Sequence, residues 1–212
     1  MGGFFMEGQM KLGLLTDIHE HVEHLQTALD LFRTEHVDQV VVIGDVFEMG
    51  QRIDETCRLL SEAKAIGVWG NHDYGLCVEP VAADCVKHGD SVIQFLTSLC
   101  PRIQIENCYF AHVEPWLNPE DVADLWYFEG PPDKHGHLDR IFNAASCRLS
   151  FAGHFHKWLL ATPDRVEDWK GDTPIKLVKE RLFVVIGALC EGRFALFDTE
   201  TSELIPFNAQ CR

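Results

Sequence analysis

The stretch Gly70-Asn71-His72-Asp73 directly follows residues 65–69, an apolar run with the sequence Ala-Ile-Gly-Val-Trp. An apolar run with β-branched and aromatic residues that stops at Gly, Asn, His and Asp predicts a buried strand followed by a loop. In an open α/β sheet, ligands bind beyond the carboxyl ends of the strands. We therefore expect this loop to belong to a ligand site.

Four other apolar runs end in the same way, with Asp or His side chains. They are residues 12–15 before Asp17 and His19, 40–43 before Asp45, 108–111 before His112, and 149–152 before His154 and His156. Because parallel sheets are buried on both faces, their strands are continuously apolar rather than alternating, as these runs are. The rest of the chain is expected to bring the five loops together.

The segments between these runs have a mainly helical pattern. Residues 20–36 and 53–63 predict amphipathic helices that return the chain to the next strand, which makes two βαβ units. Residues 74–99 are less regular, with the clearest helix over 86–99, and a short helix is predicted over 137–145. Short strands without long helices between them, at 158–162, 175–178, 181–186 and 194–198, predict an antiparallel portion.

Length and composition indicate an ordinary globular protein. The chain has 212 residues, of which 46% are hydrophobic and 24% charged, which suits one domain over residues 10–212 preceded by an N-terminal extension over 1–9. No apolar run approaches the ~20 residues of a membrane span, and the first residues lack the features of a signal peptide. We therefore expect a cytoplasmic protein that does not enter a membrane.

Net charge and cysteine usage narrow the function classes. The formal charge of −15 opposes nonspecific binding to nucleic acid or to anionic membranes. The eight cysteines are scattered and form no CxxC pair, which favours reduced thiols over disulfides. Four of them have apolar neighbours in the sequence and are expected to be buried: Cys57, Cys108, Cys147 and Cys190.

The polar residues of the five loops have the chemistry of metal ligands. Hard and borderline divalent metals prefer carboxylate oxygen and imidazole nitrogen, and a site for two ions needs an anionic ligand that bridges them. The candidate ligands are Asp17, His19, Asp45, Asn71, His112, His154 and His156. Asp45 is the natural bridge.

These motifs occur in a characteristic order. The array Asp-x-His, Gly-Asp, Gly-Asn-His-Asp, His and Gly-His-x-His, each after a predicted strand, resembles the calcineurin-like metallophosphoesterase superfamily over about residues 10–197. The resemblance implies an α/β fold in which a β-sandwich of two mixed sheets is flanked by helices, in four layers α/β/β/α.

The resemblance also implies a cofactor and a reaction. One divalent ion (Mn, Fe, Zn or Co) would take Asp17, His19, Asp45 and His156, and a second would share Asp45 and add Asn71, His112 and His154. A metal-bridging hydroxide would hydrolyse phosphate monoesters or diesters. His72 matches the histidine that protonates the leaving oxygen or stabilises charge on the phosphoryl group. The substrate would be a phosphorylated small molecule or a nucleotide.

Two further residues are assigned to the catalytic motif by the same resemblance. Asp73 completes Gly-Asn-His-Asp and is expected to hold the loop. Glu48 stands where relatives with Gly-Asp-x-x-Asp have the aspartate that orients the catalytic histidine, and it is expected to do the same. Met49 follows where phosphoprotein phosphatases have arginine. The chain is therefore similar to small bacterial members rather than to that subfamily.

Alternatives remain open at several places. Histidines outside the motifs are expected at the surface: His21, His24, His36, His88, His135 and His137. The aromatic residues of the long loop 114–133 either form a substrate wall or pack beneath the loop: Trp116, Trp126, Tyr127 and Phe128. A metal-binding scaffold of the same fold without catalysis, and a nuclease, are the alternative functions. The sequence does not indicate an oligomeric state.

Overall fold

The computed structural model describes residues 9–132 and 136–211. Most of the expected N-terminal extension, and His135, lie outside these residues. Over the described ranges the strands form two sheets. The six-stranded sheet contains, in spatial order, β3 (Ile66–Val68), β2 (Gln39–Ile43), β1 (Lys11–Leu15), β10 (Arg193–Asp198), β11 (Glu203–Asn208) and β8 (Ile175–Lys176). The five-stranded sheet contains β4 (Ile103–Ile105), β5 (Cys108–Phe110), β6 (Leu149–Ala152), β9 (Leu182–Val185) and β7 (Leu159–Ala161).

Both sheets are mixed, as expected. In the first sheet, β1 is parallel to β2, with Leu14 opposite Val41. On its other side β1 is antiparallel to β10, with Leu14 opposite Ala195. In the second, β6 is parallel to β5 and β9, whereas β4 and β7 are antiparallel to their neighbours. The helices α1 (Val22–Thr34) and α2 (Ile53–Glu62) connect β1 to β2 and β2 to β3. The two predicted βαβ units are thereby confirmed.

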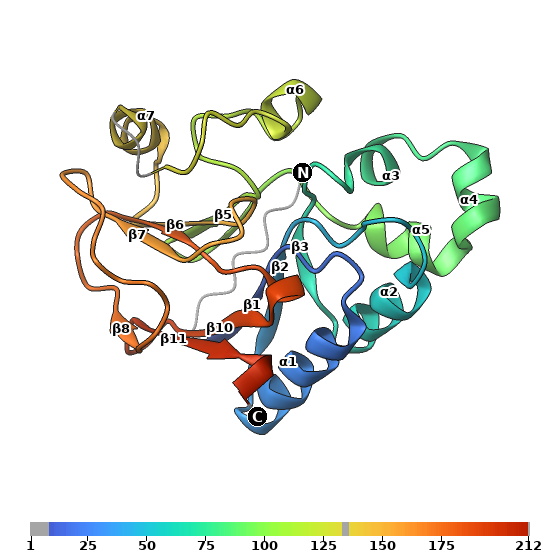
Figure 1. Cartoon of the computed structure of the whole chain (residues 1–212), viewed down its shortest axis with the longest axis horizontal. Helices are drawn as coiled ribbons and strands as arrows, with labels where there is room; N and C mark the ends of the chain where they lie inside the picture. The colour runs from blue at the N-terminus through green and yellow to red at the C-terminus, as the bar shows by residue number, and fades with distance from the viewer. Residues whose placement is uncertain (1–8, 133–135, 212) are drawn as a thin grey trace.

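Three apolar clusters hold four layers together. Figure 1 shows α1 and α2 beside the first sheet, with α6 (Val122–Leu125) and α7 (His137–Ala144) on the side of the second. Between the sheets, buried residues of both pack face to face, including Leu12, Leu14, Phe110, Phe151, Val184 and Phe197. The outer clusters join α1 and α2 to the first sheet and α7 to the second. This is the predicted α/β/β/α arrangement, and it places the carboxyl ends of β1, β2 and β3 beside those of β5 and β6.

The structure corrects two details of the sequence-based expectations. The helix expected over 86–99 is divided into α4 (Ala82–His88) and α5 (Asp90–Leu96), after the short α3 (Tyr74–Val78). Gly89 separates α4 from α5 with φ +77°, a backbone conformation that a helix cannot continue through. His88 and His137 are each only 4% exposed and are not surface residues. No helix in the described ranges has the length and apolarity needed to cross a membrane.

Candidate metal centre

Five of the seven predicted ligand residues have positive φ angles between 45° and 68°: Asp17, His19, Asp45, His154 and His156. Residues other than Gly rarely adopt this conformation, and where they do the surrounding structure must hold them in it. Each of these residues follows the carboxyl end of β1, β2 or β6 within a sharp turn. The turns direct their side chains into one space between the two sheets.

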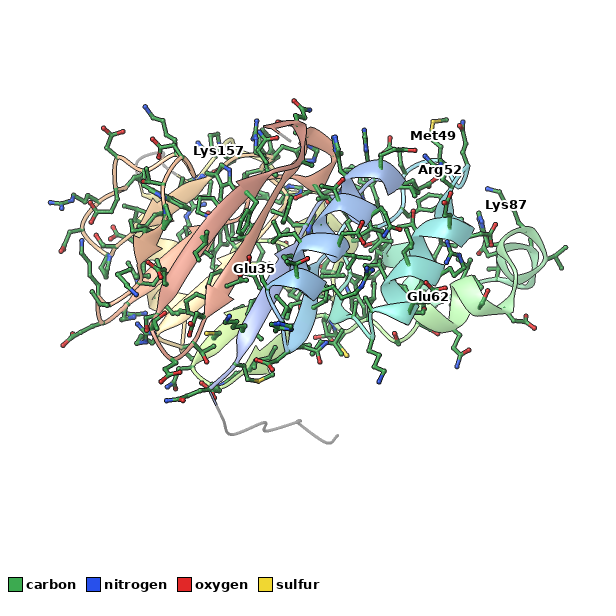
Figure 2. The ribbon with its side chains drawn as sticks, turned by 90° about the horizontal axis from the view of Figure 1, so that it is seen from below. Glu35, Met49, Arg52, Glu62, Lys87 and Lys157 are labelled. Carbon is green, nitrogen blue, oxygen red and sulfur yellow. The ribbon has the colours of Figure 1, made fainter. Side chains whose placement is uncertain are left out.

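Backbone hydrogen bonds join the loops to one another. The amides of Asp17 and Ile18 donate to the carbonyls of Gly44 (3.0 Å) and Asp45 (2.7 Å), which joins the loops after β1 and β2. The amide of His154 donates to Oδ2 of Asp17 at 3.1 Å, which adds the loop after β6 from the other sheet. Figure 2 shows Met49 and Lys157, which directly follow Glu48 and His156, on the same edge of the molecule.

The first group of candidate ligands surrounds Nε2 of His19. This atom lies 3.3 Å from Nε2 of His156, 3.7 Å from Oδ2 of Asp45 and 4.0 Å from Oδ1 of Asp17. Oδ1 of Asp17 is also 3.3 Å from Nε2 of His156. Four side chains from three loops therefore present two carboxylate oxygens and two imidazole nitrogens to one point.

The second group shares Asp45. Its Oδ2 atom lies 3.3 Å from Nε2 of His112, which is 3.1 Å from Oδ1 of Asn71. The same amide oxygen is 3.0 Å from Nδ1 of His154. Nδ1 of His112 lies 2.8 Å from the carbonyl oxygen of Ile43, which can only accept, so Nδ1 carries a proton and fixes the ring. Oδ2 of Asp45 thus faces both groups, as a bridging ligand must.

Burial and charge set the ionisation of the second group. Burial alone would raise the pKa of Asp45, but the charge of His112 and hydrogen bonds from His112 and from the His72 amide hold that pKa well below its usual range. Burial would lower the pKa of His112, yet the carboxylates of Asp45 and Asp17 outweigh it and raise this pKa to about 9. Burial and the charge of His112 lower the pKa of His154 to about 4. Near neutral pH, Asp45 is therefore an anion and His154 a neutral imidazole, the forms that bind metals, whereas His112 is protonated and would release a proton on binding one.

His72 and Glu48 lie beside the first group. The amide of His72 donates to Oδ1 of Asp45 at 3.0 Å, so the loop after β3 is attached to the shared carboxylate. Oε2 of Glu48 lies 2.7 Å from Nδ1 of His19 and 3.6 Å from Nδ1 of His72. Glu48 therefore contacts His19 more closely than the histidine that it was expected to orient.

Asp73 has a different position from the other motif residues. Its side chain is fully buried and accepts hydrogen bonds from the amides of Val46, Phe47 and Gly70 at 2.8–3.2 Å. Burial and the nearby Asp45 charge raise its pKa in spite of these bonds. Asp73 does not line the site cavity. Asp73 therefore joins the loops after β2 and β3.

The groups open into a cavity of about 590 Å³. Its lining includes His19, Asp45, Asn71, His72, His154 and His156, together with Glu48, Trp126, Phe128 and Cys190. Cys190 is only partly buried, and its sulfur lies 3.8 Å from Nδ1 of His156, so it is not the buried core thiol that its apolar neighbours predicted. Cys147 is also only partly buried, whereas Cys57 and Cys108 are buried as expected.

Sequence reasoning also missed Glu20. Its carboxylate accepts hydrogen bonds from the amides of Glu48, Gly50 and Arg52 at 2.6–2.9 Å and so fixes the loop that presents Glu48. Burial would raise the pKa of Glu20, but these bonds outweigh it and lower the pKa. The residue directly follows the Asp-x-His motif, and nothing in the local pattern distinguishes it from an exposed glutamate.

The donor set fits a pair of divalent cations. Asp17 and Asp45 are almost fully buried carboxylates, and buried charges are normally paired or bound to metal. Oδ1 of Asp17 and Nε2 of His154 are buried and have no hydrogen-bond partner among the described residues. A ligand set of carboxylate and amide oxygens together with imidazole nitrogens suits Mn, Fe, Zn or Co.

The chain is similar to known proteins in sequence and in fold. Over 162 residues the chain is 27% identical to the uncharacterized protein MJ0912 of Methanocaldococcus jannaschii; the match covers 68% of this chain and 62% of that protein, so the chain spans less than two thirds of the relative. The fold is similar to that of a metallophosphoesterase from Sphaerobacter thermophilus, with a TM-score of 0.77, 20% identity, and coverage of 97% of this chain and 90% of that one. It is also similar to an archaeal phosphodiesterase, with a TM-score of 0.55, 15% identity, and coverage of 94% and 99%. The family model described as "Calcineurin-like phosphoesterase superfamily domain" matches residues 10–202. The chain therefore belongs to the calcineurin-like phosphoesterase superfamily.

Proposed function

We propose that this protein is a dinuclear-metal phosphoesterase that hydrolyses phosphate monoesters or diesters. Membership of the superfamily supports a hydrolase activity. The observation that carries the proposal is the shared position of Asp45, whose Oδ2 atom faces His19 on one side and His112 on the other. A carboxylate between two sets of imidazoles can be shared by two ions, and two neighbouring ions are the centre on which many phosphate-ester hydrolases rely.

The ligand assignment follows the two groups. One ion would be held by Asp17, His19, Asp45 and His156, and the other by Asp45, Asn71, His112 and His154. When bound, such a pair of ions supplies Lewis acidity to the phosphoryl oxygens and hydroxide near neutral pH.

His72 is the proposed proton donor. It lines the cavity, its side chain is partly exposed, and its backbone amide is attached to Asp45. An imidazole in this place can give a proton to the departing oxygen and then recover it from solvent. Glu48 orients His19 and lies close enough to bias the orientation of His72, and Asp73 keeps the loop that presents His72 in register.

The test begins with protein stripped of metal and reloaded with Mn²⁺, Fe²⁺, Zn²⁺ or Co²⁺. We expect turnover of p-nitrophenyl phosphate or bis(p-nitrophenyl) phosphate with at least one metal. His72→Ala is expected to lower kcat by about 10²- to 10⁴-fold, the usual contribution of general acid catalysis, and to leave metal affinity unchanged. His36→Asn is a matched control, because His36 is exposed, belongs to no site and has the positive φ that Asn tolerates.

The outcomes separate the alternatives. Absence of both metal binding and turnover contradicts the proposal. Tight metal binding without turnover by the wild type identifies a non-catalytic scaffold. Salt-sensitive binding and cleavage of nucleic acid, against the formal charge of −15, identifies a nuclease.

A further inference from the structure

Two large aromatic side chains are exposed on one wall of the site cavity. Trp126 is 55% exposed and Phe128 62% exposed, and both line the cavity with the candidate metal ligands. Exposed apolar side chains are ordinary when scattered, but a pair beside a concave polar site marks a surface that contacts a ligand. We refer to Trp126 and Phe128 as the aromatic wall.

The residue between them faces the other way. Tyr127 packs against Trp116 with the rings 5.2 Å apart and nearly perpendicular, and the guanidinium of Arg140 lies 5.1 Å from the Trp116 ring centre. This inward packing anchors the segment from beneath. Trp126 and Phe128, on either side of Tyr127, line the cavity instead.

Further contacts fix the segment that leads into the wall. The indole Nε1 of Trp69 donates to the carbonyl of Pro119 at 2.8 Å, and the hydroxyl of Tyr74 donates to the carbonyl of Glu120 at 2.9 Å. Asp121 caps α6 by accepting from the amide of Ala123 at 2.8 Å. The start of the wall is thus joined to β3 and α3, which also position His72. An aromatic surface on such a support is preorganised for binding.

The wall lies next to the residues of the proposed chemistry. The Trp126 ring centre is 5.2 Å from that of His72, and the Phe128 ring centre is 6.1 Å from that of His154. Because His72 is the proposed donor to the departing oxygen, the group attached to that oxygen must pass close to Trp126.

The charge of the cavity limits what that group can be. Of the described residues that line the cavity, none is Lys or Arg, and Glu48 adds negative charge at the rim. Anionic substituents beyond the reacting phosphate would therefore meet no Lys or Arg among these residues, and Arg193, which donates to the carbonyl of the lining residue His156, is already paired with Glu191. Contact with a flat, uncharged ring is the remaining source of binding energy, because aromatic side chains stack on nucleobases and other planar rings.

We propose, resting on the function proposed above, that the aromatic wall binds a nucleobase and that the substrates are nucleotide esters rather than sugar phosphates. The base lies against Trp126 and Phe128, and the phosphoryl group lies at the metal ligands. The wall has only two rings and is open, so it suits a flat bicyclic or monocyclic base better than a long acyl chain. The wall determines specificity and takes no part in bond breaking.

The test compares substrates that share a leaving group. Adenosine 5′-monophosphate and ribose 5-phosphate both release a primary 5′-hydroxyl and differ in the base, and their methyl diesters extend the comparison to diesterase activity. We expect kcat/KM to be at least about tenfold higher for the nucleotide, as stacking on aromatic side chains implies. Trp126→Ala and Phe128→Ala are each expected to lower kcat/KM about tenfold more for the nucleotide than for the ribose ester, and so to remove this preference.

Two further variants make the result specific. Trp126→Leu keeps apolar volume without a flat face and is expected to retain only part of the preference. Val122→Ala is the matched control, because Val122 is an exposed apolar residue of the neighbouring α6 that does not line the cavity. The ratio of kcat/KM for the nucleotide to that for the ribose ester is expected to be the same in this variant as in the wild type. Metal binding and circular dichroism of each variant report whether the fold is intact.

Each outcome decides the proposal. Equal kcat/KM for nucleotide and ribose ester in the wild type, or equal losses on both substrates in the wall variants with intact folds, overturns the nucleobase assignment. Turnover of p-nitrophenyl esters without turnover of adenosine 5′-monophosphate or of its methyl diester also overturns the nucleobase assignment. Absence of turnover with every ester, p-nitrophenyl esters included, contradicts the phosphoesterase function itself. This outcome differs from turnover without a preference for the nucleotide, which contradicts only the assignment of the aromatic wall.

Discussion

Oε2 of Glu48 lies 2.7 Å from Nδ1 of His19, on the side of the ring opposite the nitrogen that faces Asp45. A carboxylate in this position orients a ligating imidazole and raises its basicity, and removing such a partner typically lowers metal affinity 10- to 100-fold. We therefore predict that Glu48→Gln lowers Mn²⁺ affinity by about 10- to 100-fold. Isothermal titration of the metal-free protein measures this loss.

The control for this variant is Glu62→Gln, which alters an exposed glutamate paired with Arg58 on α2. It is expected to bind Mn²⁺ as the wild type does. Unchanged affinity in Glu48→Gln, together with a displaced pH profile of kcat, would show instead that Glu48 acts on His72, from which it is 3.6 Å away.

The close approach of Gly70 to Asp45 gives a second prediction. A Cβ atom at residue 70 would lie 2.0 Å from Oδ1 and 2.6 Å from the amide nitrogen of Asp45, and the backbone cannot yield that much space. Gly70→Ala is expected to destabilise the fold by about 1–3 kcal/mol, the usual cost of overpacking, and to weaken metal binding at least about tenfold. Urea unfolding and metal titration measure the two effects.

Gly75→Ala is the matched control for that substitution. Gly75 lies in α3, only five residues further along, and a Cβ there meets nothing within 4 Å. Replacing a helical glycine by alanine is expected to stabilise the protein by about 0.5–1 kcal/mol. Similar destabilisation in both variants would refute the specific clash with Asp45.

Glu20 gives a prediction about pH. Its pKa is lowered from the usual 4.5 because the folded loop donates three amides to the carboxylate. A lowered folded-state pKa means that the stabilisation is complete above pH 4.5 and is lost as the pH falls through the folded-state value. Glu20→Gln is expected to lower the free energy of unfolding by about 1–3 kcal/mol at pH 7.

The difference between wild type and Glu20→Gln is expected to shrink below pH 4.5, where the wild-type carboxylate becomes protonated. Urea unfolding at several pH values, with a chelator present throughout, follows this change without interference from metal. Glu35→Gln, at an exposed residue beyond the end of α1, is the control. If the difference in the free energy of unfolding between wild type and Glu20→Gln stays constant from pH 7 to pH 3, the negative charge of Glu20 does not stabilise the loop.

Metal removal is expected to lower stability. Asp17 and Asp45 are buried anions, and cations that bind only the folded chain stabilise it by mass action. With free metal at 100 times its Kd, the free energy of unfolding is expected to rise by about 2.7 kcal/mol. Thermal unfolding with metal and with a chelator measures the increment. Identical melting temperatures in the two conditions would argue against binding at this centre.

The sequence predicted the five site loops because their signals are local. A continuous apolar run that stops at Asp, Asn or His marks both the strand and the loop after it, and no knowledge of distant contacts is needed. The βαβ units followed for the same reason, since helical spacing over residues 20–36 is visible without a partner. The order of the motifs then indicated which loops meet, which spacing alone does not.

The missed features depend on contacts between distant residues. Cys190 reaches the cavity because its amide donates to the carbonyl of Asp17 at 3.0 Å, a contact across most of the chain. Glu20 acts on amides about 30 residues away, and its local pattern is that of any exposed glutamate. Gly89 divides one expected helix through a single positive φ angle that composition does not reveal. The opposite directions of Trp126 and Tyr127 are likewise set by what lies beneath the loop.

The central position of β1 has a consequence for how the protein matures. This strand lies between β2, which is made soon after it, and β10, which is made much later. The segment just before β10 also donates the amides of Leu189 and Cys190 to the carbonyls of Thr16 and Asp17. A nascent chain in which residues 189–198 have not yet been made lacks these groups, so cation uptake is expected to follow the synthesis of this segment rather than that of the first ligand loop.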